Sequence, residues 1–200
     1  MLVLVVIMVG GVYLYARPIS DIQPTSQIPI QPKTQSIALP WPSTGQAALG
    51  AKNYGVLASN NVDDAVPIAS IAKVIAAMAV LQQKPLAAGA QGPMITLDSK
   101  DLDFYNYYYL NDGSAAKVAL GEQISEYQAL QAMLIPSANN LADSLTRWAF
   151  GSDTAYAAYA NQMLKSMGLT NTAVAGASGF ADDATSTASD LVTIGIAAIG

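Results

Sequence analysis

Residues 67–81 read Pro67-Ile-Ala-Ser70-Ile-Ala-Lys73-Val-Ile-Ala-Ala-Met-Ala-Val-Leu81, an apolar segment with a serine and a lysine near its start. The apolar run stops before Pro85 and predicts a helix that begins near Ser70 and runs to about residue 83. Residues three apart share one face of a helix, so the Lys73 amine can reach the Ser70 hydroxyl. A desolvated lysine can take the proton of a serine hydroxyl, and free N–H groups at a helix start can stabilise an oxyanion. The pair therefore indicates acyl transfer through a serine ester.

The composition limits the chemistry that this chain can perform. Its 200 residues include no histidine and no cysteine. This excludes Ser-His-Asp catalysis, thiolate nucleophiles, disulfides, and metal sites built on histidine or thiolate. A general base must then be Lys, Asp, Glu or Tyr, which favours Lys73. A formal charge of −5 with nine basic residues argues against a nucleic-acid partner, and we expect no cofactor and no metal ion.

Three regions are expected along the chain. Residues 1–16 form an uncharged apolar run, which predicts a membrane anchor or a signal segment, and the absence of a basic start favours an uncleaved anchor. Residues 17–44 are a proline-rich linker, since six of the ten prolines fall between positions 18 and 42. Residues 45–200 form the folded domain. An anchor followed by a stalk predicts a domain held outside the cytoplasm by a single N-terminal membrane segment.

Three aspartates, Asp98, Asp101 and Asp103, precede an aromatic run over residues 104–109. A calcium-binding EF-hand loop that began at Asp98 would need glycine at its sixth position and glutamate at its twelfth. Those positions hold Asp103 and Tyr109. We therefore expect a solvated loop, not a calcium site, and we interpret the tyrosines as exposed packing residues instead of the lining of a groove.

A second motif, Ser137-Ala-Asn139, follows a proline between two predicted helices. Ser137 could pass a proton to a leaving amine, and the Asn139 amide could hold a substrate backbone or orient the lysine. The alternative is that both residues simply cap a helix. Another Ser-x-x-Lys pair, Ser114 and Lys117, precedes only a short apolar segment, so we favour the pair at the head of the long helix.

Caps and turns mark other elements. Short apolar stretches at 47–52 and 54–58 predict two strands. The segment Ser125-Glu-Tyr-Gln128 predicts a capping box that opens a helix. A helix is expected from about residue 153 to residue 167, with Gly168 as its C-cap.

Taken in order, Ser70-Ile-Ala-Lys73 and Ser137-Ala-Asn139 resemble the first two signature motifs of the penicillin-binding protein and serine β-lactamase superfamily. Residues 121–142, which lead into the second motif, and Ser178-Gly-Phe180 further on resemble its low-molecular-mass D-alanyl-D-alanine carboxypeptidases. The resemblance covers about residues 45–195. It implies an α/β (α+β) fold of the β-lactamase/transpeptidase type, with an antiparallel sheet flanked by a helical cluster.

The resemblance also implies roles for the motif residues. Ser70 would be the acylated nucleophile, Lys73 its general base, and Ser137 a proton relay. Asn139 would contact the substrate, a peptidoglycan peptide ending in D-Ala-D-Ala, and β-lactams would be covalent inhibitors. The implied protein is a serine-type D-Ala-D-Ala carboxypeptidase of the bacterial cell membrane that acts in cell-wall synthesis and cell shape.

One part of the superfamily pattern is missing. No Lys-Ser/Thr-Gly follows Ser137, and Lys165-Ser-Met-Gly168 has its glycine one position late. In the superfamily this motif lies on a strand well beyond the Ser-x-Asn loop. We therefore expect residues 45–200 to be a partial DD-peptidase domain that lacks the C-terminal strands and exposes a sheet edge. On its own this chain would lack part of the pocket.

Two other functions fit the same motifs. A serine β-lactamase of this fold adds a glutamate after the Ser-x-Asn loop, whereas the last glutamate here, Glu126, precedes that loop. A catalytically silent cell-wall-binding protein would keep the fold, although intact Ser70, Lys73 and Ser137 argue against it. The residues do not distinguish carboxypeptidase from endopeptidase or transpeptidase activity.

Overall fold

The computed structural model describes residues 2–16, 38–62 and 64–199. The chain divides into two units, Met1–Leu39 and Pro40–Gly200, and each is described by itself. Most of the predicted linker, residues 17–37, lies outside the described residues. The linker and its boundaries therefore stay predictions.

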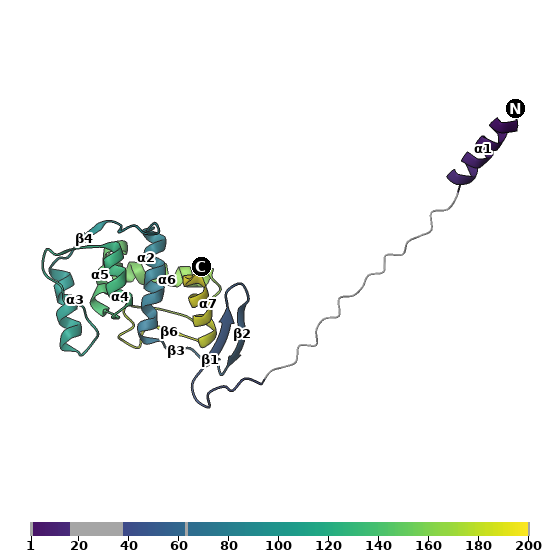
Figure 1. Ribbon diagram of the computed structural model, residues 1–200. Helices are drawn as coiled ribbons and strands as arrows, with labels where there is room; N and C mark the ends of the chain where they lie inside the picture. The colour runs from purple at the N-terminus through teal and green to yellow at the C-terminus, as the bar shows by residue number, and fades with distance from the viewer. Residues whose placement is uncertain (1, 17–37, 63, 200) are drawn as a thin grey trace. The chain divides into compact units, whose positions relative to one another are not determined.

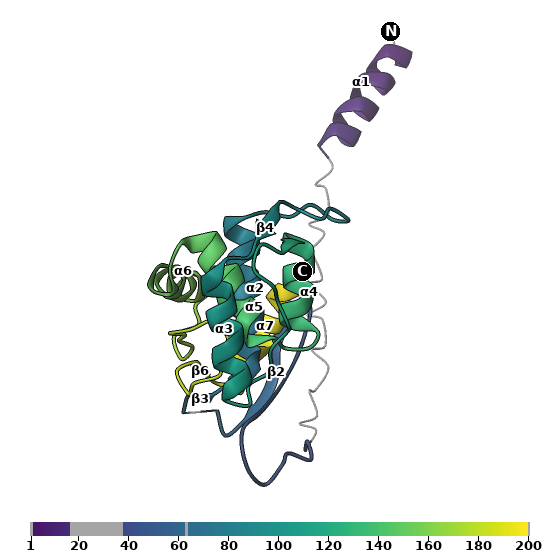
Figure 2. The ribbon, with the colours of Figure 1, turned by 90° about the vertical axis from the view of Figure 1, so that its left-hand side faces the viewer.

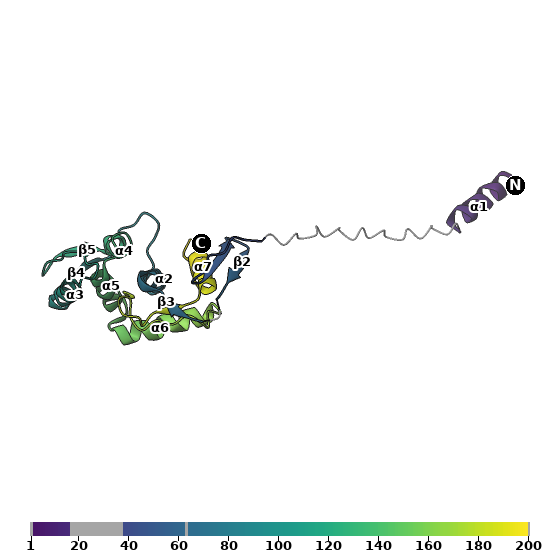
Figure 3. The ribbon, with the colours of Figure 1, turned by 90° about the horizontal axis from the view of Figure 1, so that it is seen from below.

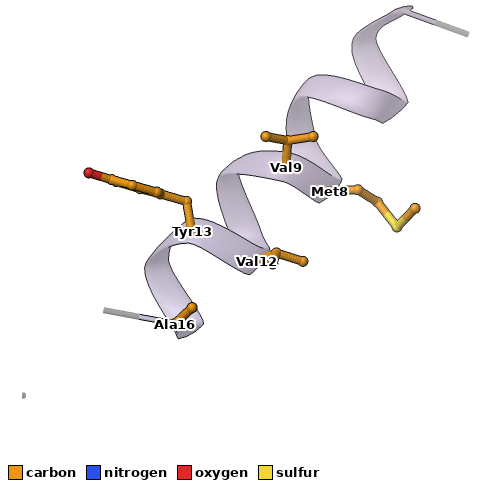
Figure 4. A pocket seen from close by; sticks show the side chains of 5 residues that line it. All are labelled: Met8, Val9, Val12, Tyr13 and Ala16. Atoms are coloured by element: carbon orange, nitrogen blue, oxygen red, sulfur yellow. The ribbon is translucent and has the colours of Figure 1, made fainter. Parts of the chain in front are cut away.

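Among its described residues, the first unit contains one helix, α1 (Leu2–Tyr15), of 14 residues. Its sequence is uncharged and apolar, and Figure 4 shows the side chains of Met8, Val9, Val12 and Tyr13 in its second half and of Ala16 directly after it. A helix of this length extends about 21 Å, less than the roughly 30 Å hydrocarbon core of a bilayer. Among the residues that the structure describes, no helix is both long enough and apolar enough to cross a membrane. The predicted single N-terminal anchor, and the membrane location inferred from it, are therefore wrong.

The second unit combines helices with three two-stranded antiparallel sheets, β1-β2, β3-β6 and β4-β5 (Figure 1). Its helical elements are a 3-10 turn η1 (Ala69–Ile71), α2 (Ala72–Gln83), α3 (Ser99–Leu110), α4 (Glu126–Leu134), α5 (Asn139–Phe150), α6 (Asp153–Ser166) and α7 (Ala188–Ala198). Its strands are β1 (Ala47–Ala51), β2 (Gly55–Asn60), β3 (Val66–Pro67), β4 (Met94–Thr96), β5 (Gln123–Ser125) and β6 (Thr185–Ser186). This arrangement confirms the predicted α/β fold of antiparallel sheets and a helical cluster.

The helix α2 lies at the centre of this unit. In two perpendicular views it stands between the α3–α4–α5 group and α7 with the β1-β2 hairpin (Figures 1 and 3), and it contacts α4, α5, α6 and α7. Seen from the α3 end, α3, α5, α2 and α7 overlap one behind another (Figure 2). Ala72, Ala76 and Ala79 are completely buried, so small side chains let the neighbouring helices approach α2 closely. Burial of α2 also takes Lys73, in its first turn, into the core.

The hairpin β1-β2 packs against α7 through a position that only glycine fits. A Cβ on Gly50 would lie 2.3 Å from a methyl carbon of Val192 on α7. The strand register shifts between Leu49 and Gly50, as in a β-bulge. The hairpin and α7 therefore form one end of the unit.

The aspartates that were expected in a solvated loop instead start the helix α3. The Asp98 side chain accepts hydrogen bonds from the backbone of Lys100 and Asp101, and Asp101 reciprocates in a capping box. Arg147 of α5 pairs with Asp98 at 3.0 Å and with the buried Asp101 at 2.9 Å. The prediction of a loop is wrong because this capping box supports helix formation directly before the aromatic run.

Candidate active site

Ser70 lies on the turn η1, immediately before α2, and is exposed. The turn is strained: Ala69 has a φ of 47°, in the left-handed region that non-glycine residues rarely adopt. Gly179 packs against this turn so tightly that a Cβ there would lie 1.9 Å from the Ala69 carbonyl oxygen. Such strain persists only where surrounding contacts hold it, and it is common at functional sites.

Lys73 follows one helical turn later and is 1% exposed. Its Nζ donates to Ser70 Oγ at 3.1 Å and to the carbonyl oxygen of Ser178 at 2.7 Å. Burial lowers the Lys73 pKa from 10.5 to about 8, although the charge of Asp143 opposes this effect. With a pKa near 8, about a tenth of the lysine is neutral at pH 7, and this neutral form can accept a proton.

Ser137 arrives from a distant part of the chain. It precedes α5 with a φ of 60°, and its Oγ donates to Ser70 Oγ at 2.8 Å across 67 positions in sequence. Ala138, which is fully buried, serves as the N-cap residue of α5. The structure thus joins Ser70, Lys73 and Ser137 in one hydrogen-bonded group.

Asn139 is the first residue of α5 and is 4% exposed. Its backbone N–H donates to the Ser114 carbonyl oxygen at 2.8 Å, and a Cβ on Gly113 would lie 3.1 Å from its Nδ2. Among the described residues it makes no hydrogen bond to Ser70, Lys73 or Ser137. The structure therefore places Asn139 beside this group and not within it.

The second Ser-x-x-Lys pair does not form a comparable arrangement. Ser114 and Lys117 are both exposed and lie in the irregular segment between α3 and β5. Ser114 contributes a backbone carbonyl that holds the start of α5. The choice of Ser70 and Lys73 over Ser114 and Lys117 stays a prediction.

Three further residues, Tyr108, Asp143 and Ser178, lie at the site although the sequence did not single them out as functional. Tyr108 of α3 donates from its hydroxyl to Asp143 Oδ2 at 2.6 Å, and its oxygen lies 3.0 Å from Ser178 Oγ. Burial raises the pKa of Asp143 to about 6, and burial together with Asp143 also raises the pKa of Tyr108. Tyr108 is buried, contrary to the expectation of exposed tyrosines, although Tyr107 and Tyr109 are exposed.

Within residues 2–16, 38–62 and 64–199, no group of three or more His, Cys, Asp or Glu side chains could hold a metal ion. The site offers hydroxyls, one amine and one carboxylate. These groups suit nucleophilic attack by serine with lysine as the base.

An α/β fold with a serine, a buried lysine and a second serine in hydrogen-bond contact defines a protein of the penicillin-binding and DD-peptidase class. The match of residues 44–200 to a family model for D-alanyl-D-alanine carboxypeptidases, peptidase family S11, shows that the chain belongs to that family. The resemblance drawn from the motifs is thereby confirmed.

Individual relatives agree with this assignment. The chain is 31% identical over 156 residues to a D-alanyl-D-alanine endopeptidase of Pseudomonas aeruginosa, a match that covers 78% of this chain and 47% of that protein. Its structure resembles a D-alanyl-D-alanine carboxypeptidase of Mycobacterium tuberculosis, with a TM-score of 0.61, 26% identity, and coverage of 76% and 53%. A peptidoglycan synthesis regulatory factor of Streptococcus pneumoniae shares the fold, with a TM-score of 0.65, 18% identity, and coverage of 77% and 46%. The chain thus spans about half the length of these proteins.

Proposed function

We propose that this protein is a serine-type D-Ala-D-Ala carboxypeptidase that acts on peptidoglycan stem peptides. The observation that carries the proposal is the position of Ser70 Oγ, 3.1 Å from Lys73 Nζ and 2.8 Å from Ser137 Oγ. Membership of the D-alanyl-D-alanine carboxypeptidase family supports the substrate. Peptidases named for carboxypeptidase and endopeptidase reactions are both among the relatives, so the choice of carboxypeptidase needs its own test.

In the proposed acylation step, neutral Lys73 accepts the Ser70 hydroxyl proton while Oγ attacks the carbonyl carbon of the penultimate D-alanine. The backbone N–H of Ser70 would hold the oxyanion of the tetrahedral intermediate. The C–N bond then breaks, and Ser137 passes a proton to the leaving amine, which departs as free D-alanine. Lys73 then gives Ser137 the proton that it took from Ser70, so both residues return to their starting protonation states and the step is balanced. Asn139 would hold the substrate backbone through its side-chain amide.

Deacylation returns the enzyme to its starting state. A water molecule attacks the ester carbonyl while Lys73 accepts one of its protons, and the C–O bond to Ser70 breaks. Lys73 gives that proton to the serine oxygen, and the shortened peptide leaves as a carboxylate after losing the second water proton to solvent. The Lys73 pKa of about 8 supports this role, because near that pH about half of the lysine is neutral.

Covalent labelling tests the nucleophile. We expect a fluorescent penicillin to label the full-length wild-type protein, and intact mass measurement to show one added penicillin. Ser70→Ala should abolish the label, because it removes the attacking oxygen. The matched control is Ser114→Ala in the other Ser-x-x-Lys pair, which should keep the label. Loss of labelling in the control but not in Ser70→Ala would show that the wrong serine has been chosen.

Substrate turnover tests the reaction class. A stem pentapeptide ending in D-Ala-D-Ala should release free D-alanine, detected by a D-amino-acid oxidase assay. Cleavage of a cross-linked muropeptide dimer without release from the pentapeptide would make the protein an endopeptidase. Rapid release of hydrolysed penicillin would identify a β-lactamase, and complete absence of labelling would favour a silent wall-binding protein.

A further inference from the structure

A chain of hydrogen bonds connects Lys73 to a carboxylate that the proposed reaction does not use. Lys73 Nζ donates to the Ser178 carbonyl oxygen at 2.7 Å. The side-chain oxygen of the same serine lies 3.0 Å from the Tyr108 hydroxyl, which donates to Asp143 Oδ2 at 2.6 Å. Four elements, α2, α3, α5 and the segment before β6, thus meet at this point.

An ionised Asp143 fixes the direction of every hydrogen bond in this chain. A carboxylate only accepts, so the single hydroxyl hydrogen of Tyr108 must point to Asp143. Ser178 must then donate its hydroxyl hydrogen to the Tyr108 oxygen. Its own Oγ remains free to accept from the backbone N–H of Phe180, which lies 3.3 Å away. Protonated Asp143 could instead donate to Tyr108 and would remove this constraint.

The segment around Ser178 is also packed so that a displacement there would reach the nucleophile. Gly179 lies against the Ala69 carbonyl, one residue before Ser70. The Phe180 ring meets the Tyr108 ring edge to face, with centroids 5.2 Å apart. A shift of Tyr108 would therefore disturb both hydrogen bonds of Lys73, the one to Ser178 and the one to Ser70.

We propose that Asp143 is a positioning residue of this site, whose carboxylate acts through Tyr108 and Ser178 to hold Lys73 against Ser70. This inference rests on the proposed function, in which Lys73 is the base. Asp143 itself touches none of the reacting atoms.

The groups around Asp143 predict the direction in which the Lys73 pKa changes when Asp143 is neutralised. It is faced by Tyr108 from α3, by Asp153 from α6, by Lys73 from α2, and by Asp183 from the segment before β6. Burial raises its pKa to about 6, against the hydrogen bond from Tyr108, so the carboxylate is ionised at neutral pH. Its negative charge raises the pKa of Lys73. Neutralising Asp143 should therefore lower the Lys73 pKa further.

Two variants separate the charge of Asp143 from its hydrogen bond. Asp143→Asn removes the charge, and Tyr108→Phe removes the hydroxyl link while the carboxylate remains. Asp103→Asn is the matched control, because it neutralises an exposed aspartate on the same helix as Tyr108. Each protein is measured in two ways: the rate of acylation by a fluorescent penicillin as a function of pH, and the titration of Lys73 by NMR with isotopically labelled lysine.

We expect Asp143→Asn to lower the plateau acylation rate about tenfold and to move the Lys73 midpoint to lower pH. Tyr108→Phe should lower the plateau by a similar factor without moving the midpoint down, and Asp103→Asn should match the wild type. If Asp143 had a merely structural role, Asp143→Asn would reduce the plateau but leave the Lys73 midpoint in place.

Defined results would overturn the inference. It fails if Asp143→Asn leaves the Lys73 midpoint unchanged, or if Tyr108→Phe keeps the wild-type plateau. A wild-type protein that penicillin never acylates would refute the proposed function separately. The NMR titration of Lys73 would still test the charge of Asp143, because it needs no turnover: an unchanged midpoint in Asp143→Asn would overturn the inference.

Discussion

Replacing Gly179 with alanine tests how tightly the nucleophile turn is held. Gly179 has a φ of 64°, and an added Cβ would lie 1.9 Å from the Ala69 carbonyl oxygen. The left-handed conformation costs alanine about 1 kcal/mol, and forcing a methyl group into packed backbone costs roughly 1–3 kcal/mol more. We expect a loss of about 3 kcal/mol in the free energy of unfolding, or about 10 °C in Tm for a chain of this size.

The same clash should also lower the rate of acylation at Ser70. To relieve it, the backbone beside Ser70 must move by about 1 Å, and a misplacement of that size can cost about a hundredfold in rate. Penicillin acylation of Gly179→Ala should fall accordingly, even below the temperature at which the variant unfolds.

Gly168→Ala is the matched control for this experiment. Gly168 has a φ of 78°, but a Cβ there would meet nothing within 4 Å. It should therefore lose only the conformational part, about 1 kcal/mol, and keep its acylation rate. Denaturant unfolding compares the two variants directly. If Gly179→Ala is no less stable than Gly168→Ala and reacts as fast as wild type, the argument from close packing is refuted.

Two other predictions concern buried charges. The folded pKa of Lys73, about 8, is below its ordinary value of 10.5, so the unfolded state binds more protons between these values and stability should rise with pH across that window. Between about pH 7 and about pH 10 this rise in the free energy of unfolding amounts to at most about 3 kcal/mol, and Lys73→Met should lack it. Denaturant unfolding of both proteins at the two pH values measures it. If the stability of both proteins changed equally with pH, the burial of the amine would be contradicted. Arg147→Met should cost roughly 3 kcal/mol, because it leaves Asp101 buried without its partner at 2.9 Å. Asp98→Ala should lower the free energy of unfolding by only about 1 kcal/mol, because it removes an N-cap. Equal losses in Arg147→Met and Asp98→Ala would contradict the claim that the buried Asp101 depends on Arg147.

Local sequence patterns determined a large share of this fold. The helix expected from Ser70 to about residue 83 is present as η1 followed by α2, and the two strands expected at 47–52 and 54–58 are present as β1 and β2. The capping box of Ser125 and Gln128 is formed in both directions. These predictions succeed because apolar periodicity and cap residues act over only a few positions. The spacing of Ser70 and Lys73 is of the same kind, since one helical turn brings their side chains together.

Only the tertiary structure decided the rest of the site. Ser137 reaches Ser70 because α5 packs on α2, and nothing near either residue encodes a contact across 67 positions. Asp143 and Tyr108 carried no motif at all, since their roles depend on burial and on the neighbours that α3 and α5 provide. In the same way, burial and not the Ser-x-x-Lys spacing distinguishes Lys73 from the exposed Lys117. Sequence could place a lysine one turn from a serine, but its pKa depends on desolvation, which exists only once the core has formed around it.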